Sequence, residues 1–210
     1  MEIELKYSID TPELFDKILS DSWVIERSES GAPEEVRMKA AYFDTSDRVL
    51  TKNNIAFRVR TEGSRTMATL KWKDDDEGIS GLYVRSEINI PLNDPNCFFD
   101  PDPEIFIESD DGMNLLEVLE GKKLVNVFDM IFTRKRIRID VGRSILEIAC
   151  DEGVIVAGSK SEQMMEMEIE IYSGSRDDLL EAGRILAGKY DLKPETRTKF
   201  ARGVALLANK

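Results

Sequence analysis

Histidine is absent from this chain of 210 residues, and cysteine occurs only twice. The lack of histidine excludes general bases and catalytic triads that use imidazole, and it excludes His-rich zinc sites. The two cysteines, Cys97 and Cys150, provide no disulfide framework, which fits a reducing compartment. We therefore expect a cytoplasmic protein whose chemistry rests on carboxylates, lysines and arginines.

Long apolar runs are also missing, and basic residues are outnumbered. No run approaches the roughly 20 residues of a membrane span, and no signal-peptide pattern precedes the first predicted strand. Lysine and arginine total 29 against 41 acidic residues, a net charge of −12. This balance argues against a general nucleic-acid surface or an anionic-membrane surface. A hydrophobic content of 41% and a charged content of 33% are typical of a globular protein of one domain or two small ones.

What the chain does have is charge at alternating positions. Glu2, Glu4 and Lys6 alternate with apolar or aromatic residues, so in a strand these three charges share one face. The alternation recurs at Arg58 and Arg60, at Lys71 and Lys73, at Arg85 and Glu87, at Arg134, Arg136 and Arg138, and at Glu166, Glu168 and Glu170. A sheet of such strands has one apolar face and one face crowded with charges of both signs. This pattern indicates a closed barrel with a charged lumen and an apolar exterior covered by helices.

Turn signals and periodicity divide the chain into short elements. Strands are predicted at 1–9, 35–44, 54–61, 66–73, 82–91, 127–140, 145–151, 154–157 and 164–172. Helices are predicted from Pro12 to about Ser20, around 114–121, after the cap residue Ser175, and from about Thr198 onward. The expected fold class is α+β, a closed antiparallel barrel of about eight strands with helices outside.

A charged lumen needs ligands of both signs, because buried charge is costly unless it is neutralised. Guanidinium groups and ammonium groups suit phosphate oxygens, and clustered carboxylates select hard divalent ions such as Mg²⁺ or Mn²⁺. The two halves together favour a linear polyphosphate held on arginines and lysines, with a metal between it and the acids. The alternative is that these strands are solvated sheet faces, or that their charges pair with one another across the barrel interior.

At this point the motifs resemble those of the CYTH domain, also called the triphosphate tunnel metalloenzymes. Glu2-x-Glu4-x-Lys6 is similar to the ExExK signature of that family. The later motifs follow in the family's order: Tyr42-Phe43-Asp44-Thr45, Arg58-x-Arg60, Thr69-Leu70-Lys71, Arg85-x-Glu87 and Lys199-x-x-Arg202-Gly203. The resemblance spans essentially the whole chain, so a single domain over residues 1–210 is expected. Within the family, the chain looks most like the bacterial inorganic triphosphatases.

The resemblance implies a role for each matching residue. Metal binding is implied for Glu2, Glu4, Asp151, Glu166, Glu168 and Glu170. Phosphate binding is implied for Lys6, Arg58, Arg60, Lys71, Arg85, Arg134 and Lys199, with Arg202 nearby. Lys73 and Arg136 are added as candidates because they lie on the same strand face as Lys71 and Arg134. Lys71, Glu4 and Arg85 are the expected catalytic residues. Crowding by cations would lower the pKa of Lys71 and let it take the proton of the attacking water. Glu87 is expected to orient a lysine or an arginine.

The implied activity is removal of the terminal phosphate of a triphosphate, with inorganic tripolyphosphate as the favoured substrate and Mg²⁺ or Mn²⁺ as cofactor. Class IV adenylate cyclase and thiamine triphosphatase activities stay open on the same fold, with Trp23 or Trp72 as loose candidates for a ring-binding aromatic. A non-catalytic polyphosphate or nucleotide binder is the alternative from another class. The expected partner is a small triphosphate, with no nucleic acid and no membrane, and the chain is expected to be a monomer or a homodimer.

Overall fold

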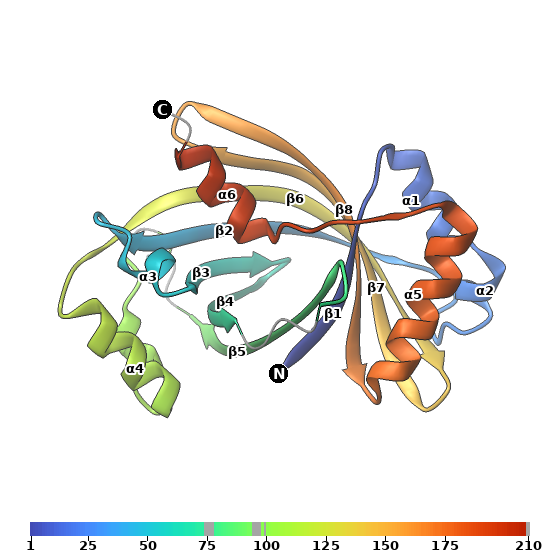
Figure 1. Ribbon diagram of the computed structural model, residues 1–210, viewed down its shortest axis with the longest axis horizontal. Coiled ribbons are helices and arrows are strands. Elements are labelled where there is room, and N and C mark those ends of the chain that lie inside the picture. The colour runs from blue at the N-terminus through green and yellow to red at the C-terminus, as the bar shows by residue number, and fades with distance from the viewer. Residues whose placement is uncertain (74–77, 94–97, 99, 209–210) are drawn as a thin grey trace.

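The computed structural model describes residues 1–73, 78–93, 98 and 100–208, and these form a closed antiparallel barrel (Figure 1). The strand order is β5-β4-β3-β2-β6-β7-β8-β1, and β1 pairs with β5 to complete the ring. A two-residue strand, β9, pairs with the end of β1 on the edge opposite β8, beyond the residues that pair with β5. The predicted α+β barrel with helices outside is confirmed. Closure pairs strand edges that an open sheet would expose.

The strands are long on one side of the barrel and short on the other. Their bounds are Glu2–Ser8 (β1), Glu34–Thr45 (β2), Ile55–Glu62 (β3), Arg65–Lys73 (β4), Leu82–Leu92 (β5), Leu124–Val141 (β6), Ser144–Ala157 (β7), Lys160–Ser173 (β8) and Lys193–Pro194 (β9). The stretches predicted at 145–151 and 154–157 form one strand. Gly153 does not break it but pairs with Phe132, where a Cβ would lie 2.4 Å from that of the phenylalanine. The glycine therefore marks a close approach of two strands.

Six α-helices lie in the described part of the chain: Pro12–Leu19 (α1), Ser22–Ile25 (α2), Val49–Lys52 (α3), Asp110–Leu119 (α4), Arg176–Tyr190 (α5) and Lys199–Ala208 (α6), with a 3₁₀ turn at Pro103–Phe106 (η2). The four predicted helices are present. The four-residue helices α2 and α3 escaped prediction because so few residues carry no periodic signal. Ser109 caps α4 by accepting a hydrogen bond from the amide of Gly112 at 3.0 Å, so this helix begins before the predicted position. Among the described helices, none has the length and hydropathy to cross a membrane.

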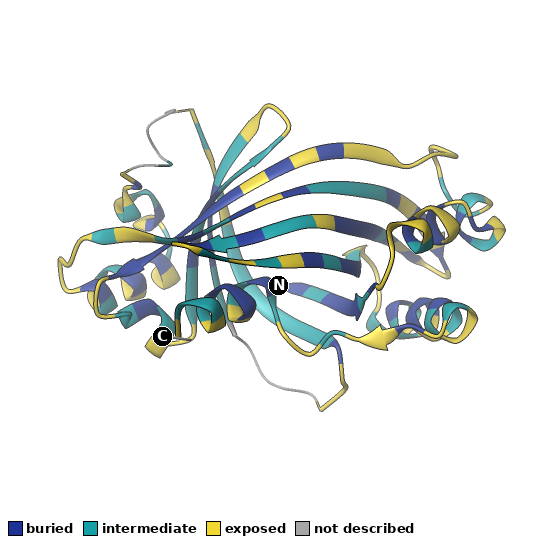
Figure 2. Cartoon of the chain, turned by 90° about the horizontal axis from the view of Figure 1, so that it is seen from above, coloured by how far each residue is buried: buried dark blue, intermediate teal, exposed yellow. Residues whose placement is uncertain are grey.

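Helices cover the apolar outer face of the barrel in two groups (Figure 1). Helices α1, α2 and α5 pack on one group of strands, where Leu5, Ile148 and Leu186 are buried together. Helix α4 packs on another group, where Phe57 and Leu115 share a second core. Buried and less buried residues alternate along the strands (Figure 2). The apolar half of the sequence alternation is thus used for the outer cores.

Helix α6 packs differently, against side chains that have the same strand parity as the charged residues. Tyr42 and Phe128 stack with ring centroids 4.4 Å apart, and Phe200 of α6 lies 5.9 Å from Tyr42. The inner face is therefore apolar where α6 covers it and charged farther along. Gly203 allows this approach, because a Cβ at that position would lie 2.3 Å from the ring of Phe128.

We predict that Gly203→Ala lowers the free energy of unfolding by about 1–3 kcal/mol, because the added methyl group overpacks the contact between α6 and Phe128. The matched control is Gly188→Ala in α5, where a Cβ would have nothing within 4 Å. This control should raise stability by about 0.5–1 kcal/mol through the helix preference of alanine. Urea unfolding of both variants measures the difference, and equal stabilisation by both would contradict the close packing of α6.

Candidate functional site

The inner faces of the strands enclose a cavity of about 140 Å³, which we call the lumen. Most of the predicted site residues line it: Glu2, Glu4, Lys6, Arg58, Arg60, Lys71, Arg85, Arg134, Arg136, Glu168, Glu170 and Lys199. Asp151, Glu166 and Arg202 do not line it but are buried close to it. The side chain of Lys73 lies outside the described residues.

Strand register brings these residues together from distant parts of the chain. Glu4 pairs with Glu170, and Lys6 with Glu168, across the β1–β8 ladder. Arg134 pairs with Asp151 across the β6–β7 ladder. Because paired residues on one face of a sheet are direct neighbours, each ladder contributes a row of adjacent charges to the inside of the barrel.

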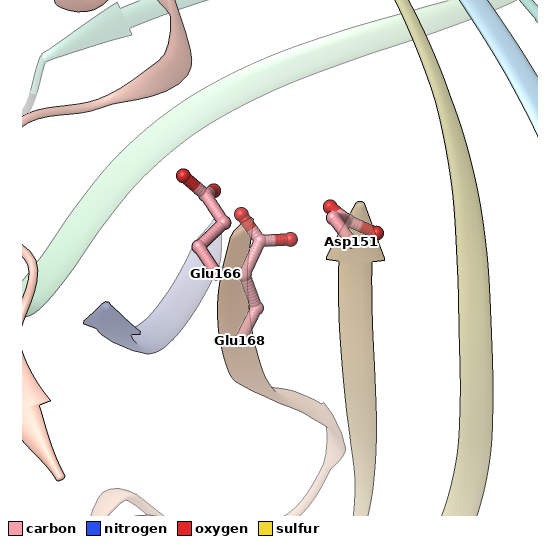
Figure 3. A group of neighbouring side chains, drawn as sticks. All are labelled: Asp151, Glu166 and Glu168. Carbon is pink, nitrogen blue, oxygen red and sulfur yellow. The ribbon is translucent and has the colours of Figure 1, made fainter. Parts of the chain in front are cut away.

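Asp151, Glu166 and Glu168 point to a common space (Figure 3). Each offers an oxygen within 4.8 Å of the others, a spacing that a metal ion could bridge. The ammonium of Lys199 already lies among them, 2.7 Å from Asp151, 2.5 Å from Glu166 and 2.7 Å from Glu168. Burial disfavours this ammonium, but the field of the carboxylates outweighs burial and raises the pKa of Lys199 well above its ordinary value. We call this arrangement the lysine socket.

Two arginines also contact the carboxylates of the lysine socket. Arg134 donates two hydrogen bonds to Asp151, at 2.8 and 2.7 Å, and a third to Glu168 at 2.7 Å. Arg202 donates to Glu166 at 3.1 Å and to the backbone carbonyl of Gln163 at 2.7 Å. Such buried carboxylates are stable only because each accepts several charge-assisted hydrogen bonds. Arg202 therefore ties α6 to β8 beside the lumen.

Glu2 and Glu4 are also paired, with residues of β4 and β5 and, for Glu4, with Lys6 at 3.4 Å. Arg85 contacts Glu4 and lies 3.3 Å from Glu2. Lys71 lies 2.7 Å from Glu2 and 2.9 Å from Glu87. Glu87 thus orients a lysine, as expected. The cations expected to crowd Lys71 are not its nearest neighbours, because its two contacts are carboxylates.

Glu170 has no cation of its own. No ion pair reaches it within the described residues, and its neighbours Glu2 and Glu4 are also acids. Burial, followed by the negative charges of Glu2 and Glu4, raises the pKa of Glu170 to about 8. A cation bound in this part of the lumen would favour the ionised form of Glu170.

Arg58 and Arg60 give another part of the lumen an excess of positive charge. Arg58 donates to the hydroxyl of Tyr42 at 3.3 Å, and in the described part of the chain no carboxylate lies within ion-pairing distance of either arginine. The Nε atoms of both are buried without a hydrogen-bond partner. Burial, followed by the charges of Arg58 and Arg134, lowers the pKa of Arg60 to about 10. Unpartnered buried donors on adjacent cations are suited to an anion.

Glu62, Glu147 and Phe200 are among the lumen residues that were not predicted. Glu62 lies two positions after Arg60 on β3, and Glu147 lies four positions before Asp151 on β7, so continued alternation could have identified both. Phe200 comes from α6 and carries no such signal. Arg136 lines the lumen as predicted, but it is hydrogen-bonded to Glu62 at 2.5 Å and to Glu34 at 3.0 Å.

We predict that Lys199→Met lowers the free energy of unfolding by about 3–5 kcal/mol in EDTA, because it leaves three buried carboxylates without their shared cation. Part of this loss should return in Mg²⁺, since the vacated space is bounded by carboxylate oxygens. The control is Lys193→Met, whose side chain is 69% exposed and whose removal should leave stability unchanged. Urea unfolding with and without the metal checks both, and a loss no larger than the control's would contradict the lysine socket.

Comparison with solved structures confirms the fold. A candidate adenylyl cyclase of Hippeastrum, described as having a dominant triphosphatase activity, superimposes with a TM-score of 0.69 at 17% identity, covering 98% of this chain and 96% of that one. A candidate adenylate cyclase of Bacillus halodurans gives a TM-score of 0.62 at 20% identity, covering 96% of each chain. At these identities the likeness concerns the barrel alone.

Comparison of sequences identifies the family. An inorganic triphosphatase of Haemophilus influenzae is 28% identical over 165 residues, which are 79% of this chain. The matched region is 44% of that protein, so the chain spans less than half the length of this relative. The family model of the CYTH domain matches residues 1–204. The charged lumen, the closed barrel and this match agree, and the chain belongs to the CYTH domain family.

Proposed function

We propose that this protein is a metal-dependent hydrolase that removes the terminal phosphate of a triphosphate, with inorganic tripolyphosphate as the favoured substrate. One observation carries the proposal: a single lumen holds arginines without carboxylates and a carboxylate without a cation. Polyphosphate alone would neutralise Arg58 and Arg60 but would oppose the ionisation of Glu170, because it adds negative charge beside that carboxyl group. Polyphosphate together with a divalent ion neutralises both, and the sequence relative supports the same class of substrate.

The acids that face the lumen fit a hard divalent ion. Glu2, Glu4, Glu168 and Glu170 supply only oxygen, which suits Mg²⁺ or Mn²⁺. When bound, such an ion neutralises charge on the phosphate oxygens during transfer. We assign Asp151 and Glu166 chiefly to holding Lys199, because their oxygens already accept from Lys199, Arg134 and Arg202.

The cations would hold and orient the phosphate chain. Arg58, Arg60 and Arg134 would bind its oxygens, together with Lys6 and Lys199. Water would attack the terminal phosphorus, its new oxygen–phosphorus bond forming as the bridging bond breaks, to give phosphate and diphosphate. Arg85 would stabilise charge on the leaving diphosphate. Lys71, held between Glu2 and Glu87, would bind phosphate; its role as a base stays a prediction.

A second candidate substrate is an organic triphosphate, and a specific cavity favours it. An apolar space of about 520 Å³ adjoins the lumen and shares Ala56, Lys71, Arg85 and Phe200 with it. Its walls include Trp72, Tyr83 and Leu82, which would suit a nucleoside or thiamine ring. Trp23 lies elsewhere, with Arg27 over its ring at 4.7 Å, and contributes nothing to this space.

Purified protein should release phosphate from tripolyphosphate in the presence of Mg²⁺ or Mn²⁺, and EDTA should abolish the release because the paired acids then lack their ion. ATP and thiamine triphosphate, assayed in parallel, test the organic candidate, and cyclic AMP is measured in the same reactions. Preference for either organic substrate would replace the inorganic assignment. Tight binding of all three without any product would identify a non-catalytic binder.

Glu4→Gln should lower kcat by about 100-fold or more, because Glu4 contacts Arg85, pairs with Glu170 and would lose its charge toward the metal. The control is Glu117→Gln, an exposed residue of α4 that should keep the normal rate. Steady-state phosphate release across a range of Mg²⁺ concentrations makes the comparison. A Glu4→Gln enzyme with a normal rate and a normal metal requirement would rule out the metal assignment.

A further inference from the structure

A second cavity adjoins the lumen at the side opposite the apolar space. It has a volume of about 850 Å³ and opens beside the β3–β4 hairpin, with Glu34, Arg65 and Arg138 among its walls. We call it the outer cavity. Three residues line both the lumen and the outer cavity: Glu62, Arg136 and Glu147. Only these three charged side chains are common to the two cavities in the described part of the chain.

The three residues form a connected row of ion pairs. The guanidinium of Arg136 on β6 lies 2.5 Å from Glu62 on β3 and 3.9 Å from Glu147 on β7. Glu34 on β2 and Arg138 on β6 extend the row, at 3.0 Å from Arg136 and 3.1 Å from Glu147. The row reaches from β3 across β2 and β6 to β7. We call Glu62, Arg136 and Glu147 the partition.

The partition can open at modest cost. Arg136 is 23% exposed and Glu62 is 19% exposed, unlike Lys199 and Asp151 in the lysine socket, at 8% and 0%. Ion pairs near solvent contribute little net free energy, because water solvates the separated charges. A phosphate oxygen is a good competitor for the guanidinium, since it accepts the same charge-assisted hydrogen bonds.

We propose that the partition sets the length of phosphate chain that the lumen accepts. This inference rests on the proposed function. With Arg136 held by Glu62, the lumen ends at the partition, and the two glutamates repel any phosphate that extends past it. A longer chain enters only if Arg136 leaves Glu62 and binds the additional phosphate. The chain then continues into the outer cavity, where Arg138 and Arg65 lie. Arg136 is thus a specificity-determining residue rather than a ligand of tripolyphosphate.

The test compares tripolyphosphate with linear polyphosphates of four or more phosphates as substrates. Both are assayed with the wild-type protein and with its Glu62→Gln variant. The readout is kcat/KM for the longer chain divided by kcat/KM for tripolyphosphate. Glu62→Gln should raise this ratio by about fivefold, the change expected from releasing one partly exposed ion pair. The control is Glu35→Gln, an exposed residue next along β2 from Glu34, which should leave the ratio unchanged. An unchanged ratio in Glu62→Gln would overturn the proposal.

A double variant separates the two ways in which Glu62 could act. In Glu62→Gln combined with Arg136→Gln, the gain should disappear, because the acquired ligand is Arg136. A gain that persists would show that Glu62 acts by repulsion alone and would overturn the role of Arg136. If Glu62→Gln fails to fold, Glu34→Gln releases a second contact of Arg136 from a side chain that is 64% exposed, and the ratio should again rise.

Calorimetric binding of the same two chain lengths separates this inference from the proposed function. If the wild-type protein binds both polyphosphate lengths but hydrolyses neither, the proposed function fails. The ratio of the two dissociation constants then tests the partition by itself. A shift of that ratio toward the longer chain in Glu62→Gln supports the partition, and an unchanged ratio overturns it.

Discussion

Charge balance inside a closed barrel is the constraint on which the rest of this structure depends. A charge on an inward strand position cannot reach bulk water as a surface charge can, so each needs a partner. The lysine socket shows the paired case, in which the three carboxylates contact the ammonium groups of Lys199 and Lys6 and two guanidinium groups. It also joins α6 to β7 and β8, so the fold and the lumen are stabilised by the same contacts.

The lumen departs from balance in two places, and both departures are local. Arg58 and Arg60 lack carboxylates, while Glu170 lacks a cation. Arg58 and Arg60 line the same cavity as Glu170, but they lie on β3 and Glu170 lies on β8, so these groups do not form an ion pair. The structure keeps them apart, and the proposed function assigns the arginines to the phosphate chain and the carboxylate to the metal ion. The apolar space and the outer cavity then give the two sides of the lumen different chemistry.

Much of the barrel could be predicted from period-two alternation, because side chains on a strand must point to opposite faces in turn. This rule correctly placed Glu2, Glu4 and Lys6 on one inner face. The predicted strands at 145–151 and 154–157 left out Gly153, which lies inside one continuous strand and marks close packing. The rule also could not predict where α6 packs, because the apolar inner residues Tyr42 and Phe128 have the same spacing whether a helix or a ligand covers them.

Because parity along a strand is a local property, the sequence alone predicts which residues of one strand share a face and which chemical types gather inside the barrel. Only the tertiary structure decided which charges neutralise one another. Lys199 is separated from Glu166 by a whole helix and β9, and no spacing rule predicts that its ammonium enters a group of acids. Arg136 has the same parity as Arg134 but meets Glu62 instead of Asp151. Partner choice depends on distances across the barrel, which are set by register and closure and not by the order of residues along the chain.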